Sequence, residues 1–192
     1  MLSIRFHGRG GQGTVIASKL LANALFREGW EVQAFPSFGA ERTGAPVAAF
    51  LRADRRPITV HCQVYDPDVV VVLDALLMRA VDVTAGLPPG GRLLVNSTRP
   101  PGELGVAPGF HVATCDATGI ALAHGLGTRT QPIVNTAIVG ALAAFTGFVS
   151  IETVLAIIPD VVPINAESNQ QAAREASTRL VIDTAPAALT HA

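Results

Sequence analysis

The sequence predicts an α/β fold: a three-layer α/β/α domain around a mostly parallel sheet. Three observations support this prediction. Segments with strand-like and helix-like spacing of apolar residues alternate along the chain. A glycine-rich turn joins the first predicted strand to the first predicted helix. The unbroken run Val69–Leu73 is bounded by polar turn residues, as is typical of a strand buried on both faces of a parallel sheet.

The first 35 residues are expected to form one βαβ unit. Leu2–His7 alternates apolar and polar residues like a short strand. From Thr14 the apolar residues follow helical spacing, and Gly29 is a suitable helix stop. Trp30–Phe35 is the second predicted strand, so the two strands flank a crossover helix.

A loop and three further strands are expected in the next part. The loop Pro36–Gly44 has a proline at its start and a glycine at its end. Strands are predicted over Ala45–Leu51 and, as a short hairpin return, over Ile58–His61. The buried strand Val69–Leu73 then ends at Asp74.

The second half continues the alternation of strands and helices. Asp74 and Asp116 are expected to cap the helices that follow them, and Ser150 has the side chain of an N-cap. Residues 1–182 are predicted to form a single domain and residues 183–192 a frayed tail. The expected elements are a short helix over Ala75–Val83, strands over Arg92–Val95 and His111–Cys115, a helical turn over Thr118–His124, and helices over Ile133–Phe145, Ser150–Ile158 and Ala166–Leu180.

Composition excludes several classes of protein. The chain has 192 residues, of which 49% are hydrophobic and 15% are charged, with a formal net charge of −1. Intrinsic disorder is excluded by the apolar content, and nucleic-acid binding is not expected because no basic field exists. The low charge is typical of a chain that hides surface against partners, although an alanine-rich core would explain it equally well. No apolar run is long enough to cross a membrane and no signal peptide is visible, so a cytoplasmic location is expected.

The polar residues of interest follow the predicted strands. In open parallel sheets, functional groups gather beyond the carboxyl ends of the strands. The glycine-rich turn, the loop Pro36–Gly44, Asp74, Asn96 and Asp116 all occupy such positions. We therefore expect these segments to meet at one edge of the sheet.

The glycine-rich turn permits three interpretations. Gly8, Gly10 and Gly13 match G-x-G-x-x-G between a strand and a helix, a context that suits a phosphate. A dinucleotide site also needs an acidic residue at the end of the second strand, but Glu31 stands at its start. The glycines can instead serve only tight packing of the strand and helix. Arg9 and Gln12 favour a turn that meets a polar ligand or another chain.

Several motifs together resemble the gamma subunit of 2-oxoacid:ferredoxin oxidoreductases, with the pyruvate enzymes as the best match. The resemblance rests on HGRGGQG at residues 7–13 and AFPSFGAERTGAPV at residues 34–47. VYDPD at residues 64–68, DATGIA at 116–121 and PIVNTA at 132–137 follow in the same order. The similarity extends over about residues 1–180, and the long string around Glu41, Arg42 and Thr43 is its most specific part.

The resemblance implies a subunit of a larger enzyme that has no activity alone. In this family thiamine diphosphate, held with Mg²⁺, decarboxylates a 2-oxoacid, iron–sulfur clusters pass electrons to ferredoxin or another acceptor, and coenzyme A accepts the acyl group. The resemblance therefore implies alpha, beta and delta partner subunits, with the cofactors held mainly by them. Two cysteines, Cys62 and Cys115, cannot ligate a cluster by themselves.

No catalytic or metal-binding residue is expected in this chain. His7, His61, His111 and His124 show no spacing typical of metal ligands. Pyruvate is the expected substrate of the complex, with phenylglyoxylate, a branched-chain 2-oxoacid or 2-oxoglutarate as alternatives; an independent nucleotide-binding module is the alternative from another class. The candidate cofactor-binding or interface residues are Gly8, Arg9, Gly10, Gly11, Gln12, Gly13, Ser37, Glu41, Arg42 and Thr43.

Overall fold

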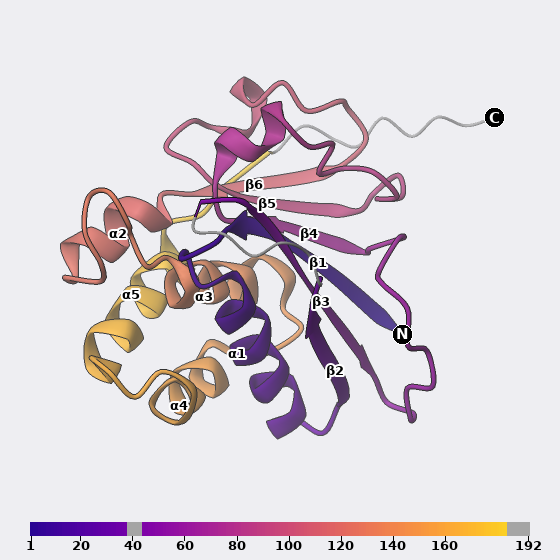
Figure 1. The fold of residues 1–192 in the computed structure, drawn as a ribbon, viewed down its shortest axis with the longest axis horizontal. Coiled ribbons are helices and arrows are strands. Elements are labelled where there is room, and N and C mark those ends of the chain that lie inside the picture. Colours follow the sequence, from indigo (N-terminus) through magenta and orange to yellow (C-terminus); the bar gives the residue numbers. More distant parts are fainter. Residues whose placement is uncertain (38–43, 184–192) are drawn as a thin grey trace.

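A computed structural model describes residues 1–37 and 44–183 and shows a seven-stranded sheet packed against five α-helices (Figure 1). The strands lie in the order β2-β3-β1-β4-β5-β6-β7. The α/β class predicted from the sequence is therefore confirmed. The strands are β1 (Leu2–Arg9), β2 (Glu31–Pro36), β3 (Pro46–Asp54), β4 (Val69–Val72), β5 (Arg92–Asn96), β6 (His111–Cys115) and β7 (Val181–Ile182).

The sheet is mostly parallel, as predicted. β1, β4, β5 and β6 pair in parallel, while β3 is antiparallel to both β1 and β2. β2 therefore runs in the direction of β1 but lies two strands away. The predicted βαβ unit forms with β3 inserted between its two strands. Only β3 and β7 among the described strands run against the others.

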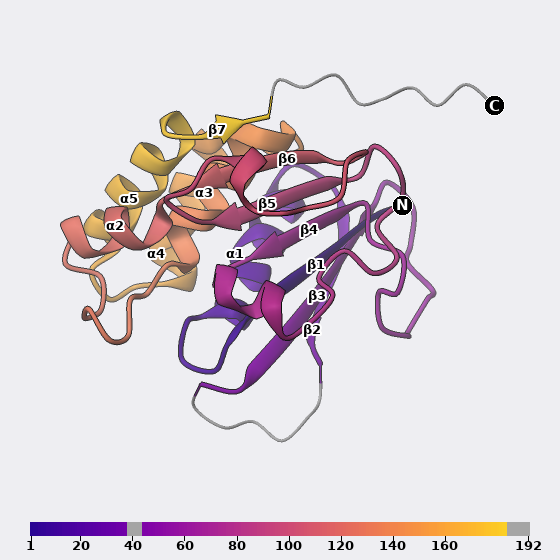
Figure 2. The same cartoon turned by 90° about the horizontal axis from the view of Figure 1, so that it is seen from above.

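Five helices cover one face of the sheet and enclose the main core (Figures 1 and 2). Side chains alternate between the faces of each strand, so Val69 and Val71 enter this core and Val70 and Val72 enter the opposite one. Because both faces of β4 are buried, successive side chains are all in apolar surroundings, which explains the unbroken run of valines. The helices are α1 (Thr14–Arg27), α2 (Ala117–Ala123), α3 (Asn135–Thr146), α4 (Ile151–Val161) and α5 (Ala166–Thr178).

The opposite face has a thinner cover than the sequence suggests. The helix predicted over Ala75–Val83 is only a 3₁₀ helix, η1 (Ala75–Arg79). A second short 3₁₀ helix, η2 (Pro101–Glu103), follows β5. These segments and their loops enclose a small core of Val70, Val72, Val83, Leu87, Leu93, Val95 and Val112.

A buried arginine fastens part of this thinner layer to the sheet. Arg5 on β1 is 8% exposed, and its guanidinium donates hydrogen bonds to the carbonyls of Val64, Tyr65, Val83 and Ala85. Its Nε also donates to Nε2 of His7 at 3.0 Å, so this nitrogen of the His7 ring carries no proton and the ring is neutral. Burial, together with the nearby Arg5 charge, lowers the pKa of His7 to about 4.

Three local predictions about helix starts are confirmed. Asp74 accepts a hydrogen bond from the Leu76 amide, and Asp116 accepts one from the Gly119 amide. Ser150 Oγ accepts the Thr153 amide at the start of α4. Each side chain satisfies an amide that the first helical turn leaves without a backbone partner.

Two predictions about strands need correction. Ile58–His61 forms no strand, because β3 already pairs with β1 on one side and β2 on the other and offers no free edge. The short strand β7 at Val181–Ile182 was not predicted; it pairs with β6 after α5 ends at Thr178. Most of the predicted tail, residues 184–192, lies outside the described residues. No helix in the described ranges is long and apolar enough to cross a membrane.

The small-residue helix predicted around Ile133–Phe145 is buried within the domain. It forms α3, and Gly140 lies directly against the backbone of Ala173 on α5. A Cβ atom at position 140 would overlap the Ala173 carbonyl. The absence of a side chain at Gly140 therefore sets how closely α3 and α5 approach.

We predict that Gly140→Ala destabilises the chain. The new methyl group must push α3 from α5, an overpacking cost of about 1–3 kcal/mol that exceeds the gain of about 1 kcal/mol in helix propensity. Gly102→Ala is the matched control, because nothing lies within 4 Å of a Cβ at that position. Urea unfolding measures both changes. Equal stability of Gly140→Ala and Gly102→Ala would contradict the packing assigned to α3 and α5.

We also predict that His7 makes stability depend on pH. Its pKa is about 4 in the folded chain and near 6.5 when unfolded, so the unfolded state binds more protons between these values. Stability is complete above pH 6.5 and falls as the pH drops toward 4. Between pH 7.5 and pH 5 the wild-type chain should lose about 1–2 kcal/mol more than His7→Gln. Parallel pH profiles for the two proteins would rule out this role.

Candidate functional site

The glycine-rich turn between β1 and α1 is closed by its own hydrogen bonds. The Arg9 amide donates to Gln12 Oε1 at 2.9 Å, and the Gln12 amide donates back to the Arg9 carbonyl at 3.1 Å. Gln12 thus acts on the backbone of the turn through its side-chain oxygen. The turn lies at the edge of the sheet where the parallel strands β1, β4, β5 and β6 have their carboxyl ends, which we call the carboxyl edge.

The same turn is fastened to the start of β3. The Gly10 amide donates to the Ala45 carbonyl at 2.9 Å, and the Gly44 amide donates to the Gly10 carbonyl at 3.1 Å. Arg9 Nη1 also donates to the Gly44 carbonyl at 3.2 Å. The Gly10 amide already has a protein acceptor, which speaks against the dinucleotide interpretation of the motif.

The glycines of the turn have different roles. A Cβ at Gly8 would overlap Thr14 Oγ1, and a Cβ at Gly13 would lie 2.7 Å from Asn135 Nδ2. Gly13 also has a φ of +80°, which L side chains rarely adopt. Gly11 has a φ of +96° but faces open space. Tight packing therefore explains Gly8 and Gly13, while Gly11 forms an open tip of the turn.

An ion pair connects the ends of β1 and β4. Arg9 Nε lies 2.5 Å from Asp74 Oδ2, and both side chains are at least partly covered. Asp74 uses its other oxygen, Oδ1, to accept the Leu76 amide. Asp74 therefore has two tasks: it caps η1 and it orients the Arg9 side chain across the sheet edge.

A small groove lies between the glycine-rich turn and a second turn. It has a volume of about 130 Å³. Its lining residues are Arg9, Gly10, Gly11, Gln12, Gly44, Thr130, Gln131 and Pro132. We call this the glycine-loop groove. It joins segments that are more than 100 positions apart in the sequence.

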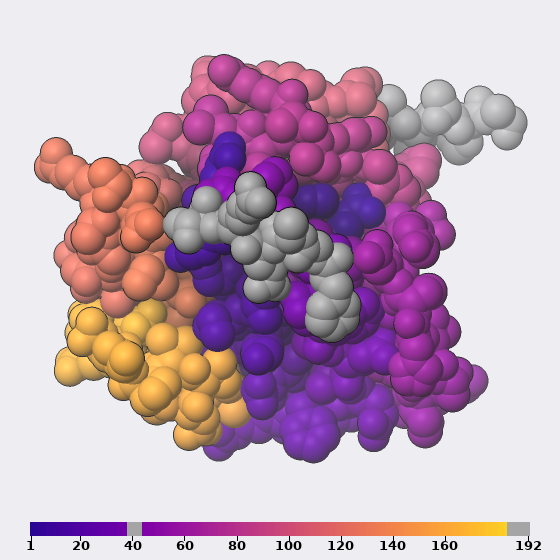
Figure 3. Space-filling model, in the orientation of Figure 1, coloured from indigo at the N-terminus to yellow at the C-terminus, as the bar shows by residue number. Residues whose placement is uncertain are grey.

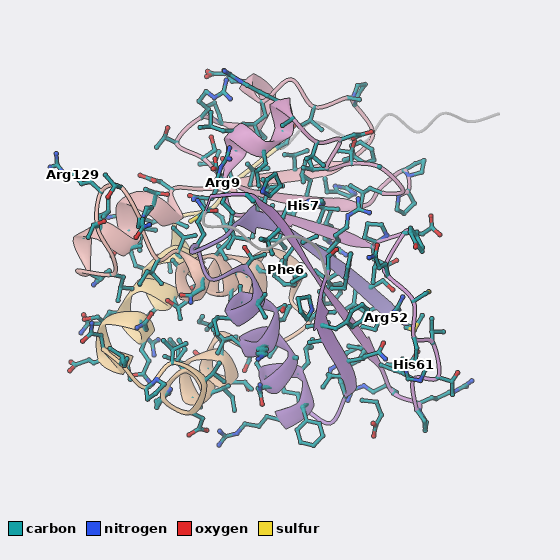
Figure 4. All side chains as sticks on the ribbon, viewed as in Figure 1. Phe6, His7, Arg9, Arg52, His61 and Arg129 are labelled. Carbon is teal, nitrogen blue, oxygen red and sulfur yellow. The ribbon has the colours of Figure 1, made fainter. Side chains whose placement is uncertain are left out.

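The second turn, residues 127–132, lies between the predicted helical turn Thr118–His124 and the predicted helix Ile133–Phe145, where the sequence indicated no helix or strand. Gly127 and Pro132 form an isolated β-bridge, and the amides of Thr128 and Gln131 each donate to the other residue's carbonyl at 3.1 Å. The turn projects from the body of the molecule, with Arg129 exposed at its tip (Figures 3 and 4). Because no apolar periodicity marks this turn, the sequence does not show that it lies beside the glycine-rich turn.

A larger hollow lies at the carboxyl ends of β4, β5 and β6. It has a volume of about 480 Å³, and Gln12 reaches it from the glycine-rich turn. Asn96 braces its floor: Nδ2 donates to the Leu73 carbonyl at 2.8 Å, and Oδ1 accepts the Thr118 amide at 3.1 Å. We call this hollow the strand-end crevice. Its formation confirms that Asp74, Asn96 and Asp116 gather at one edge.

The remaining predicted site residues have mixed outcomes. Ser37 lies at the end of β2, where its amide donates to the Ala48 carbonyl at 2.8 Å. Glu41, Arg42 and Thr43 lie outside the described residues. The structure thus brings together Gly8–Gly13 and Gly44 but places Ser37 after β2, which β3 separates from β1.

The cysteines and histidines do not add a metal site within the described ranges, where no three His, Cys, Asp or Glu side chains cluster suitably. Burial and nearby Asp116 raise the pKa of Cys115 to about 11. Cys62 is exposed, with Arg52 Nη2 3.6 Å from its sulfur. Arg52 and His61 lie far from Arg9 in Figure 4.

Known proteins with similar sequences and structures are components of oxidoreductases. A "Pyruvate/ketoisovalerate oxidoreductases common subunit gamma" of Thermococcus kodakarensis is 51% identical over 187 residues, covering 95% of this chain and 98% of the relative. A "Pyruvate synthase subunit PorC" of Methanocaldococcus jannaschii is 52% identical over 160 residues, covering 83% and 85%. The crystal structure of pyruvate oxidoreductase subunit PORC from Thermotoga maritima has a TM-score of 0.80 at 36% identity, covering 95% and 98%.

The family assignment follows from matches along almost the whole chain. The sequence profile described as "Pyruvate ferredoxin/flavodoxin oxidoreductase" matches residues 3–178. This range includes the glycine-rich turn, the strand-end crevice and all five α-helices. The chain therefore belongs to the pyruvate ferredoxin/flavodoxin oxidoreductase family.

Proposed function

We propose that this chain is the gamma subunit of a multi-subunit, thiamine-diphosphate-dependent 2-oxoacid:acceptor oxidoreductase. The complex oxidatively decarboxylates a 2-oxoacid, transfers the acyl group to coenzyme A and passes electrons to ferredoxin or another acceptor. The observation that carries the proposal is the match to named gamma and PorC subunits over nearly their full length. A cytoplasmic location is part of the proposal.

The residues of this chain do not fit the redox cofactors of such a complex. An iron–sulfur cluster is held by about four cysteine thiolates. The chain has only two cysteines. Cys115 is buried, and its burial raises the pKa of its thiol to about 11. Cys62 is exposed, and its sulfur lies near Arg52. We therefore assign thiamine diphosphate, Mg²⁺ and the clusters to alpha, beta and delta type partner subunits.

The carboxyl edge of the sheet is the part that we propose to face those partners. The glycine-rich turn, the Arg9–Asp74 ion pair and the hydrogen-bonded turn 127–132 are formed there in the isolated chain. Preformed loops lose little conformational entropy when they dock. The predicted interface or cofactor-contact residues Glu41, Arg42 and Thr43 lie outside the described residues and directly precede Gly44, whose amide bonds to the glycine-rich turn.

Pyruvate is the proposed substrate of the complex, and the choice of 2-oxoacid is proposed to lie in the partner subunits. The Thermococcus kodakarensis relative is named as common to pyruvate and ketoisovalerate oxidoreductases. A shared subunit fits a role in completing the complex, and such a role serves phenylglyoxylate, branched-chain 2-oxoacid or 2-oxoglutarate enzymes equally well. An independent nucleotide-binding module is disfavoured, because the Gly10 amide is already bonded to Ala45.

The experiment is purification of the tagged chain from its native host under anaerobic conditions. We expect alpha, beta and delta type partner subunits to copurify with it, with iron in the partners only, and coenzyme A-dependent oxidation of pyruvate by the assembled complex. The isolated chain should have no activity. A chain that stays alone in the native host, or that oxidises a 2-oxoacid unaided, would contradict the proposal.

We predict that Arg42→Ala lowers turnover of the assembled complex and leaves its iron content unchanged. The reason is that Arg42 belongs to the family-specific segment that we propose to take part in the interface, whereas the clusters are proposed to be held by partner subunits. Arg56→Ala, at the opposite end of β3, is the matched control and should keep full turnover. Unaltered kinetics of the Arg42→Ala complex would remove this segment from the proposed role.

A further inference from the structure

We propose that the opposite edge of the sheet carries a second docking site, centred on Tyr65, for a lysine or arginine side chain of a partner subunit. The parallel strands β1, β4 and β5 have their amino ends at this edge, which we call the amino edge. It lies beside the N-terminus in Figure 1, away from the carboxyl edge. The inference rests on the proposed function, which supplies the partner subunits, and goes beyond it because that function uses only the carboxyl edge.

Tyr65 presents an aromatic ring that the fold itself does not use. The residue is 65% exposed, and its side chain makes no hydrogen bond or ring contact with a described residue. Its neighbours Val64 and Pro67 are buried. Tyrosine side chains anchor many protein interfaces, because the ring offers a large contact area at a low cost in side-chain entropy. The exposed ring is therefore suited to contact another chain.

The backbone that carries Tyr65 is firmly held. The buried guanidinium of Arg5 donates to the Tyr65 carbonyl at 3.3 Å. Gly86, with a φ of +76°, packs so closely that a Cβ atom there would overlap the same carbonyl oxygen. The Ser3 amide donates to Asp68 Oδ2, and the Asp68 amide donates to the Ser3 carbonyl, both at 2.8 Å. A ring presented from a fixed backbone loses less entropy when it docks.

Arg5 also fixes a second loop, residues 82–86, relative to Tyr65. Its Nη2 atom donates to the carbonyls of Val83 and Ala85. The loops that lead into β4 and β5 are thus joined through one buried side chain. Their exposed side chains form one surface at the amino edge.

The charges of this surface favour a cation. Asp66, Asp68 and Asp82 are exposed, and none of them forms an ion pair with a described residue. Burial lowers the pKa of Arg5, and the nearby carboxylates of Asp66 and Asp82 oppose this shift. Arg5 is 8% exposed and its guanidinium is bonded to backbone carbonyls. The carboxylates around Tyr65 therefore remain available to an incoming charge.

A lysine or arginine side chain matches both features of this surface. A cation over the face of a tyrosine ring is attracted by the ring electrons, and the carboxylate of the adjacent Asp66 adds a charge interaction. Asp66 makes no hydrogen bond to a described residue. A second copy of this chain is a poor occupant, because a symmetric contact would bring the same three carboxylates together. We therefore assign the site to a partner subunit with a basic surface.

Photo-crosslinking of the assembled complex identifies the occupant. Tyr65→benzoylphenylalanine is introduced into the tagged chain in its native host, and the purified complex is irradiated. We expect a crosslink to a surface segment of one partner subunit in which a lysine or arginine lies at the crosslinked position or next to it. Phe26→benzoylphenylalanine is the matched control, because Phe26 is 64% exposed but lies on α1. It should give no crosslink to that segment.

Variants of the two central residues test their contribution to binding. We expect Tyr65→Ala to increase the rate at which the partner leaves the immobilised complex about tenfold or more, whereas Tyr65→Phe keeps the ring and the wild-type rate. Phe26→Ala should leave the rate unchanged. Asp66→Asn should increase the rate at low salt and make it less dependent on KCl concentration. Circular dichroism of each variant establishes that it is folded.

Two results would overturn this inference. One is equal release rates for Tyr65→Ala and Phe26→Ala, and the other is a crosslink from position 65 only to a second copy of this chain or to no protein. If the wild-type chain assembles with its partners and either result is found, only the amino-edge site is refuted. A wild-type chain that purifies alone from its native host refutes the subunit assignment, and this site with it.

Discussion

The parallel alignment of β1, β4, β5 and β6 is the constraint on which the rest of this structure depends. Because these strands end at one edge, Arg9 and Asp74 lie 2.5 Å apart although 64 residues separate them along the chain. Four valines buried on both faces of β4 keep that alignment. The glycine-rich turn, both hollows and the start of β3 are positioned by it.

The two faces of the sheet are covered in different ways. The helical face is closed by α3 and α5, whose approach depends on Gly140. On the thinner face, the buried guanidinium of Arg5 holds the covering segments to the sheet by donating hydrogen bonds to four of their backbone carbonyls. Short 3₁₀ helices leave the ends of β4 and β5 accessible, and this accessibility creates the strand-end crevice. The fold thus combines a rigid body with one open edge.

The sequence predicted the features that depend on local pattern. The valine strand, the caps Asp74 and Asp116 and the meeting of polar groups at one edge follow from periodicity and from general rules of parallel sheets. The insertion of β3 between β1 and β2, and with it the absence of a strand at Ile58–His61, depends on long-range pairing that no local pattern encodes. The turn 127–132 was missed for the same reason, because its place beside Gly11 is set by the packing of distant segments.

The central claim is that the open edge is where this subunit meets its complex. Hydrogen–deuterium exchange of the free chain and of the assembled complex tests it directly. The account predicts strong additional protection in the complex at residues 9–13, 44–46 and 127–132, with little change in α4. Protection confined to α4 and α5, with the carboxyl edge exchanging as in the free chain, would contradict it.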